Sequence, residues 1–145
     1  EKGMFENEVY LGIKQLLRDL TKQGVLCLVA TSKPEIYAKK ILDYYELSNY
    51  FYYIAGANMD GTRTDKAEVI AYALKQIPAE YNNKKVLMVG DRSHDIIGAK
   101  KNGIDCAGVL FGYGSREELE EAGADFVADS VEAVKNIVFS DIARN

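Results

Sequence analysis

The chain has 145 residues, of which 48% are hydrophobic and 28% are charged. These proportions are typical of one folded domain and exclude a disordered or low-complexity chain. The net charge of −4 predicts no nucleic-acid partner. No apolar stretch approaches the ~18 residues of a membrane span, so no membrane partner is expected either.

Helical and strand patterns alternate from the start of the chain. Apolar residues between positions 13 and 20 recur with helical spacing, and Gly24 is predicted to end this helix. The uninterrupted apolar run 25–30 predicts a strand that is buried on both faces. Ser32 and Glu35 have the spacing of a capping box, which predicts that the next helix begins there.

The same alternation continues to the end of the chain. We predict further strands at 52–55, 86–89, 106–111 and 126–128, and further helices after the caps Asp65, Ser115 and Asp129 and from about Asp95 to Asn102. This order indicates a doubly wound, mostly parallel α/β sheet, in one domain spanning 1–145. In such sheets the chemistry lies at the carboxyl ends of the strands.

Asp91 follows one of these strands directly, and Asp95 stands four residues further on. Two carboxylates with this spacing at a strand-to-helix turn can face one point, and Mg²⁺ takes one or two protein carboxylates. The alternative is that one of them only caps the following helix. His94 lies between them; a proton-transfer role is one interpretation, and a solvent-facing turn is favoured.

Thr31 and Ser32 end the strand predicted at 25–30, where hydroxyls and a helix N-terminus can hold an anion. Simple capping by Ser32 is the alternative. Lys66 stands in the first turn of a predicted helix, where a cation opposes the helix dipole. A bound phosphate explains it better than folding does, and a solvated surface lysine is the alternative.

The two cysteines, Cys27 and Cys106, both lie in apolar runs. We interpret them as buried free thiols of a cytoplasmic protein. Because His94 is the single histidine and the cysteines are not clustered, the sequence excludes a structural zinc site.

Three features follow one another in the chain at successive strand ends: a hydroxyl, a lysine and a pair of carboxylates. In this combination the sequence resembles the haloacid dehalogenase superfamily of phosphohydrolases. Leu28–Pro34 looks like its second motif, Thr64–Lys66 like its third, and Val89–Asp95 like its fourth, the GDxxxD form. Asp60–Arg63 and Phe111–Ser115 are similar to the phosphoglycolate-phosphatase-like branch. The resemblance covers the chain from about position 10 to position 134.

The resemblance implies a Rossmann-like three-layer α/β/α core and a Mg²⁺-dependent phosphatase acting through an aspartyl-phosphate. The implied substrate is a small phosphorylated metabolite, with phosphoglycolate as the first candidate. By the same resemblance, Thr31 and Ser32 bind phosphate, Lys66 neutralises its charge, and Asp91 and Asp95 belong to the metal site. The alternatives are a phosphate-binding or scaffold module without catalysis, and a phosphotransferase or nucleotidase with the same core.

The family's first motif, a strand ending in the nucleophilic aspartate, has no match ahead of Thr31. Asn58–Thr62 mimics it but begins with an amide and follows the second motif, so we interpret this segment as a loop. The chain therefore resembles the C-terminal portion of such an enzyme, with residues 1–10 as the end of the cap or its linker. Alone, it is expected to be inactive.

In the family's fold, the missing strand lies between the strands that end at Thr31 and at Asp91. Its absence would leave backbone groups unpaired, at roughly 1–3 kcal/mol for each buried one. We therefore expect these two strands to pair directly, or to pair with a strand from another chain or from the missing N-terminal segment.

Overall fold

The structure is a computed structural model that describes residues 7–142. The helices are α1 (Asn7–Lys22), α2 (Glu35–Tyr44), α3 (Lys66–Lys75), α4 (Ser93–Lys101), α5 (Arg116–Ala122) and α6 (Val131–Ile137). The strands are β1 (Leu28–Pro34), β2 (Tyr53–Ala57), β3 (Leu87–Gly90), β4 (Asp105–Val109) and β5 (Phe126–Ala128). The chain divides into two compact units, which are described separately: residues 17–83, and the part up to Leu16 together with the part from Lys84 onward.

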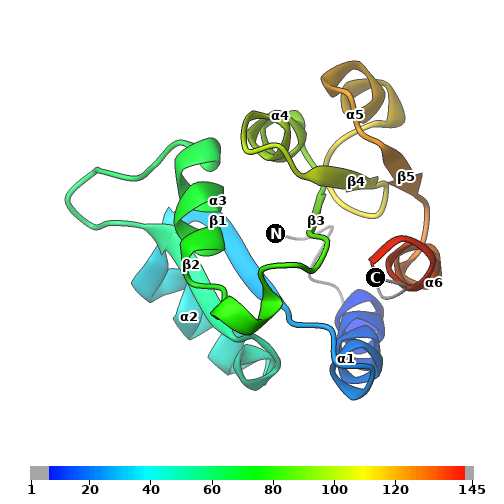
Figure 1. The fold of residues 1–145 in the computed structure, drawn as a ribbon, viewed down its shortest axis with the longest axis horizontal. Helices are drawn as coiled ribbons and strands as arrows, with labels where there is room; N and C mark the ends of the chain where they lie inside the picture. The colour runs from blue at the N-terminus through cyan, green and yellow to red at the C-terminus, as the bar shows by residue number, and fades with distance from the viewer. Residues whose placement is uncertain (1–6, 143–145) are drawn as a thin grey trace. The chain divides into compact units, whose positions relative to one another are not determined.

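In the unit of residues 17–83, β1 and β2 form a parallel pair with Leu28 opposite Tyr53. Helices α2 and α3 pack against opposite faces of this pair (Figure 1). The centre of the core is small and aliphatic, formed by Ala55, Val69 and Ala73. The predicted cap of α3 is confirmed, because the Asp65 side chain accepts the N–H of Ala67.

The predicted capping box at Ser32 is wrong. Strand β1 continues to Pro34, and α2 begins only at Glu35 without a side-chain cap. A residue that precedes proline is held in an extended conformation, so Lys33 cannot begin a helix. Ser32 therefore lies on a strand, and the Glu35 carboxylate accepts the N–H of Gly56 instead of a helix-capping bond.

The second unit contains the parallel sheet β3-β4-β5, in which Gly90 lies opposite Gly108. Helices α4 and α5 cover one face of this sheet, and α6 lies on the other (Figure 1). Ile96, Cys106 and Leu119 are fully buried between α4, α5 and β4. The cap predicted at Asp129 is displaced by one residue, because Ser130 accepts the N–H of Ala133 at the start of α6.

Strands β1 and β3 are edge strands of their own sheets. Among the described residues, β1 is hydrogen-bonded to β2 within its unit and β3 to β4 within the other, and direct pairing of β1 with β3 stays a prediction. No residue of β1 is fully buried, and Val89 of β3 is 40% exposed. Helices α2 and α3 contact β1, so the incomplete burial of β1 arises at its edge and not from an open face.

The thiols of Cys27 and Cys106 are not joined in a disulfide, as predicted. Burial raises the pKa of Cys27 to about 11.

No helix between residues 7 and 142 is long and apolar enough to cross a membrane. Of the segment predicted to be the end of the cap or its linker, residues 1–6 lie outside the described residues.

Candidate active site

Asp91 follows the carboxyl end of β3, and the loop after β4 holds its carboxylate. The N–H of Tyr113 donates to Asp91 Oδ2 at 2.9 Å. A Cβ atom on Gly112 would lie 2.4 Å from Asp91 Cβ, and one on Gly114 would lie 2.2 Å from the Asp91 carbonyl oxygen. Because no side chain fits in these two contacts, the loop approaches Asp91 only with glycine at both positions.

Asp95 holds the turn between β3 and α4. Its side chain is buried, and the residue is 4% exposed. Its Oδ2 accepts the backbone N–H groups of Asp91 at 3.0 Å and Arg92 at 3.2 Å. A Cβ on Gly90 would lie 2.4 Å from the same oxygen, so the preceding glycine is also required. Asp95 Oδ2 thus makes the capping bond of the alternative interpretation, and its place in the metal site stays a prediction.

His94 lies beside this turn with an exposed side chain, in agreement with the favoured solvent-facing interpretation. Its Nε2 atom is 3.9 Å from Asp95 Oδ1, and 57% of the side chain is exposed.

Glu118 of α5 also contacts this turn. The sequence patterns did not predict this contact. Its Oε2 accepts from Arg92 Nε at 2.9 Å and from the N–H of Ser93, the first residue of α4, at 2.7 Å. Ser115 and Glu118 have capping-box spacing, but only the serine caps α5. The hydrogen bond from Arg92 lowers the pKa of the Glu118 carboxyl.

Replacing Glu118 by glutamine is expected to lower stability at neutral pH but not in acid. A carboxyl whose pKa is lowered by folding stabilises the folded state above its ordinary pKa of 4.5, and this stabilisation is lost as pH falls through the lower, folded value. Thermal unfolding of both proteins between pH 3 and 7 measures this effect. A difference in melting temperature that stays constant over the whole range would contradict it.

Replacing Gly112 by alanine is expected to destabilise the protein by ~1–3 kcal/mol, the usual cost of an overpacked contact. The added methyl group must displace Asp91, so Mg²⁺ affinity should fall as well. Denaturant unfolding and Mg²⁺ titration measure the two effects. Gly12→Ala is the matched control, because its Cβ would lie 3.4 Å from Val131, which is ordinary contact.

The predicted phosphate-binding residues all belong to the other unit. Thr31 and Ser32 are near the carboxyl end of β1, and Lys66 is the first residue of α3, which packs against β1. Thr31 Oγ1 accepts the N–H of Lys33 at 3.2 Å. Thr31 and Lys66 are half-buried and Ser32 is exposed. That the three side chains share one anion stays a prediction.

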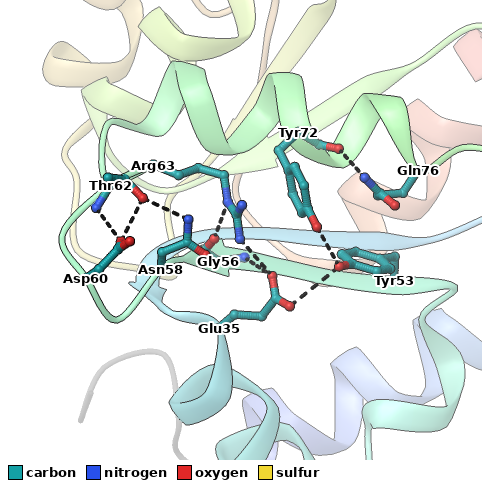
Figure 2. Close-up of polar contacts among 9 residues, drawn as sticks. All are labelled: Glu35, Tyr53, Gly56, Asn58, Asp60, Thr62, Arg63, Tyr72 and Gln76. Atoms are coloured by element: carbon teal, nitrogen blue, oxygen red, sulfur yellow. Dashed lines mark hydrogen bonds and ion pairs between the residues drawn. The ribbon is translucent and has the colours of Figure 1, made fainter.

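Five residues of the same unit form a connected cluster of polar contacts (Figure 2). This cluster, called the Arg63 cluster below, consists of Glu35, Tyr53, Gly56, Arg63 and Tyr72. Arg63 donates from Nε to the Gly56 carbonyl oxygen at 2.9 Å. The hydroxyls of Tyr53 and Tyr72 are 3.0 Å apart, and this hydrogen bond, together with burial and the charge of Glu35, raises the pKa of Tyr53 to about 12.

The segment Asn58–Thr62 is a loop, as predicted. Asp60 Oδ1 accepts the N–H of Thr62 at 3.1 Å and its hydroxyl at 2.7 Å, and these bonds lower the pKa of Asp60. Asn58 Nδ2 donates to the same hydroxyl at 2.8 Å. The Asp60 carboxylate thus closes a turn and is not carried on a strand.

Asp91 and Asp95 differ in their fitness to hold a metal ion. Hard carboxylate oxygens suit Mg²⁺, which commonly binds one or two of them and keeps several waters. Asp91 is partly exposed at the strand end, whereas Asp95 Oδ2 already accepts two backbone N–H groups. Within residues 7–142, no group of three His, Cys, Asp or Glu side chains is arranged to hold a metal ion. Asp91 is therefore suited to be a ligand, whereas Asp95 Oδ2 holds the turn beside it, and the prediction that both belong to a metal site stays a prediction.

The family model for haloacid dehalogenase-like hydrolases matches residues 2–109. The chain belongs to this family. It is 43% identical over 119 residues to a 5'-nucleotidase of Pseudomonas aeruginosa, covering 81% of this chain and 52% of the relative. It is 41% identical over 127 residues to the tyrosine-protein kinase PtkA of Mycobacterium tuberculosis, covering 87% and 43%.

Two further comparisons concern phosphatases of this family. A phosphoglycolate phosphatase of Pseudomonas fluorescens is 30% identical over 125 residues, covering 85% of this chain and 44% of the relative. A crystal structure of a "predicted phosphatase" from Clostridium acetobutylicum has a TM-score of 0.82 at 40% identity, covering 89% of this chain and 59% of that one. The family and the fold predicted from the sequence are thus confirmed, and the chain spans about half the length of the curated relatives it matches.

Proposed function

We propose that the protein carrying this chain is a Mg²⁺-dependent phosphatase that hydrolyses small phosphomonoesters. The observation that carries the proposal is the Asp91 carboxylate, which Tyr113, Gly112 and Gly114 hold at the carboxyl end of β3. When bound there, Mg²⁺ would neutralise charge on the phosphoryl group. Asp95 and Glu118 act on the turn that presents Asp91, through hydrogen bonds to its backbone and to its neighbours.

In the other unit, the residues that would bind the phosphate are Thr31, Ser32 and Lys66. Hydroxyls donate hydrogen bonds to phosphate oxygens, and the lysine ammonium adds a positive charge. Phosphoryl transfer depends mainly on positioning and charge neutralisation, which these groups supply.

The nucleophilic aspartate that the family resemblance implies must come from outside the residues of this chain. Support comes from the sheet order: among the described residues β1 pairs with β2 alone and β3 with β4 alone, so each of these apolar strands could pair with one more strand. We propose that a strand from the rest of a longer protein, or from a second copy, pairs there and brings the aspartate. The 145 residues alone would then bind phosphate without turning over.

Nucleoside 5′-monophosphates come first among the substrates, ahead of the phosphoglycolate predicted from the sequence. The reason is that the match to the 5'-nucleotidase has 43% identity, compared with 30% for the phosphoglycolate phosphatase. A phosphotransferase is the second candidate, favoured by the 41% identity to PtkA. The cytoplasmic location inferred from the free thiols is part of the same proposal.

The test is phosphate release from AMP, UMP and phosphoglycolate by the whole protein that carries this chain, with and without EDTA. We expect release from the nucleotides that stops with EDTA and returns with excess Mg²⁺. A parallel reaction with ATP and a tyrosine peptide tests the second candidate. The proposal would be abandoned if no phosphomonoester were hydrolysed, and peptide phosphorylation would then favour the phosphotransferase.

A further inference from the structure

Three separate elements contact the side chain of Arg63. Its Nε donates to the carbonyl of Gly56 in β2 at 2.9 Å, and its Nη2 lies 3.4 Å from Glu35 Oε1 at the start of α2. Its guanidinium carbon stands 3.7 Å from the centre of the Tyr72 ring in α3. The side chain is 19% exposed. A cation that is mostly removed from water thus has a carbonyl, a carboxylate and an aromatic face as partners.

The backbone at Arg63 is in the left-handed region, with φ of 54°. This conformation is uncommon for a residue with a side chain and is energetically unfavourable. Such a cost persists where the surrounding contacts determine the conformation. The Arg63 cluster supplies these contacts, and they hold the backbone three residues before Lys66.

Gly56 joins the other side of the cluster to β1. Its N–H donates to Glu35 Oε1 at 3.1 Å. A Cβ on Gly56 would lie 2.7 Å from the Lys33 carbonyl oxygen and 2.7 Å from Glu35 Cα, so β2 touches the junction between β1 and α2. This junction begins directly after Ser32. The cluster therefore connects the segment that carries Thr31 and Ser32 with the segment that carries Lys66.

We propose that Arg63 is a positioning residue for phosphate binding: it fixes the segment of Lys66 against the segment of Thr31 and Ser32. The inference rests on the proposed function and adds to it a residue that does not itself touch the phosphate. In Figure 2, Arg63 reaches back from its loop toward Glu35 and Gly56 while Tyr72 extends from α3 toward Tyr53. An arginine suits this place because its planar fork donates along two directions while its face stacks on the ring.

Arg116 and Glu120 provide a matched control pair. Their separation is also 3.4 Å, but both side chains are more than half exposed, and both lie on α5 in the other unit. Exposed pairs of this kind contribute little. Arg116→Ala therefore removes an arginine from an ion pair of the same length without disturbing the elements that carry Thr31 and Lys66.

The experiment uses the whole protein that carries this chain, as wild type, Arg63→Ala, Arg63→Lys and Arg116→Ala. It measures binding of inorganic phosphate by calorimetry, and kcat and KM for AMP. A misplacement of about 1 Å costs on the order of 100-fold in rate, so we expect kcat/KM of Arg63→Ala to fall by that factor. Phosphate binding should weaken about tenfold, with Arg63→Lys in between and Arg116→Ala like the wild type. Millimolar guanidinium should restore phosphate binding to Arg63→Ala but not to Lys66→Ala, which a merely structural role would not produce.

Wild-type phosphate affinity and kcat/KM in Arg63→Ala would overturn the inference and leave the proposed function standing. A wild-type protein that neither binds phosphate nor hydrolyses AMP would overturn both. Should Arg63→Ala fail to fold, Arg63→Lys decides. Weakened binding in a folded protein with a wild-type melting temperature supports the inference, and unchanged binding overturns it.

Discussion

Replacing Asp91 by asparagine is expected to abolish Mg²⁺-dependent phosphate release while leaving the fold intact. An asparagine oxygen can still accept the Tyr113 N–H, which is 2.9 Å from Asp91 Oδ2, and the side chain keeps its size against Gly112. The change removes the negative charge alone. Losing a residue that only orients a metal ligand lowers metal affinity ~10–100-fold, so losing the ligand charge should cost at least ~100-fold.

Mg²⁺ titration of AMP hydrolysis, and Mn²⁺ binding followed by electron paramagnetic resonance, measure this loss. Asp105→Asn is the matched control. Asp105 belongs to the same sheet but stands at the amino end of β4, opposite Leu87, and it pairs with Lys85 at 3.4 Å. Removing this exposed pair should change stability by less than ~1 kcal/mol and leave metal binding unchanged. Equal Mn²⁺ affinity in Asp91→Asn and the wild type would exclude Asp91 as a ligand.

Local patterns in the sequence predict most of this fold, and the errors have local causes. The strand Phe126–Ala128 occurs where it was predicted. Strand β1 begins three residues later than the apolar run, because hydrophobicity alone does not separate the approach to a strand from the strand itself. It also ends later, because Pro34 keeps the chain extended past Ser32. The burial predicted for the run 25–30 was too high: no residue of β1 is fully buried, since β1 is an edge strand of its sheet.

The residues of the candidate site also fall into two groups: those that local sequence patterns predict and those that they do not. Asp91, Lys66 and Thr31 could be predicted because the end of a parallel strand and the start of a helix are visible as patterns of a few residues. The residues that hold them could not be predicted. Tyr113 is 22 residues from Asp91 in sequence, Glu118 is 26 from Arg92, and Arg63 is 28 from Glu35. No local periodicity connects residues so far apart, and the fold alone brings them into contact.

Replacing Lys66 by alanine is expected to lower kcat by ~10²–10³, the usual effect of removing one group that stabilises transition-state charge. The same change should cost little stability. Lys66 is the first residue of α3, where a cation meets the positive end of the helix dipole, an interaction unfavourable by ~0.3–1 kcal/mol. Alanine is also a better helix former. We therefore expect the free energy of unfolding to change by less than ~1 kcal/mol while catalysis is lost.

Lys75→Ala is the control on the same helix, with the opposite electrostatic sign. Lys75 is exposed in the last turn of α3, where a cation is favourable, so its loss should lower stability by a few tenths of a kcal/mol, up to about 1, and leave kcat unchanged. Urea unfolding and steady-state hydrolysis of AMP give both quantities for each variant. If Lys66 served folding and not phosphate, Lys66→Ala would resemble Lys75→Ala in both measurements. A selective loss of kcat in Lys66→Ala, with stability equal to or above that of Lys75→Ala, is the result that the phosphate-binding role requires.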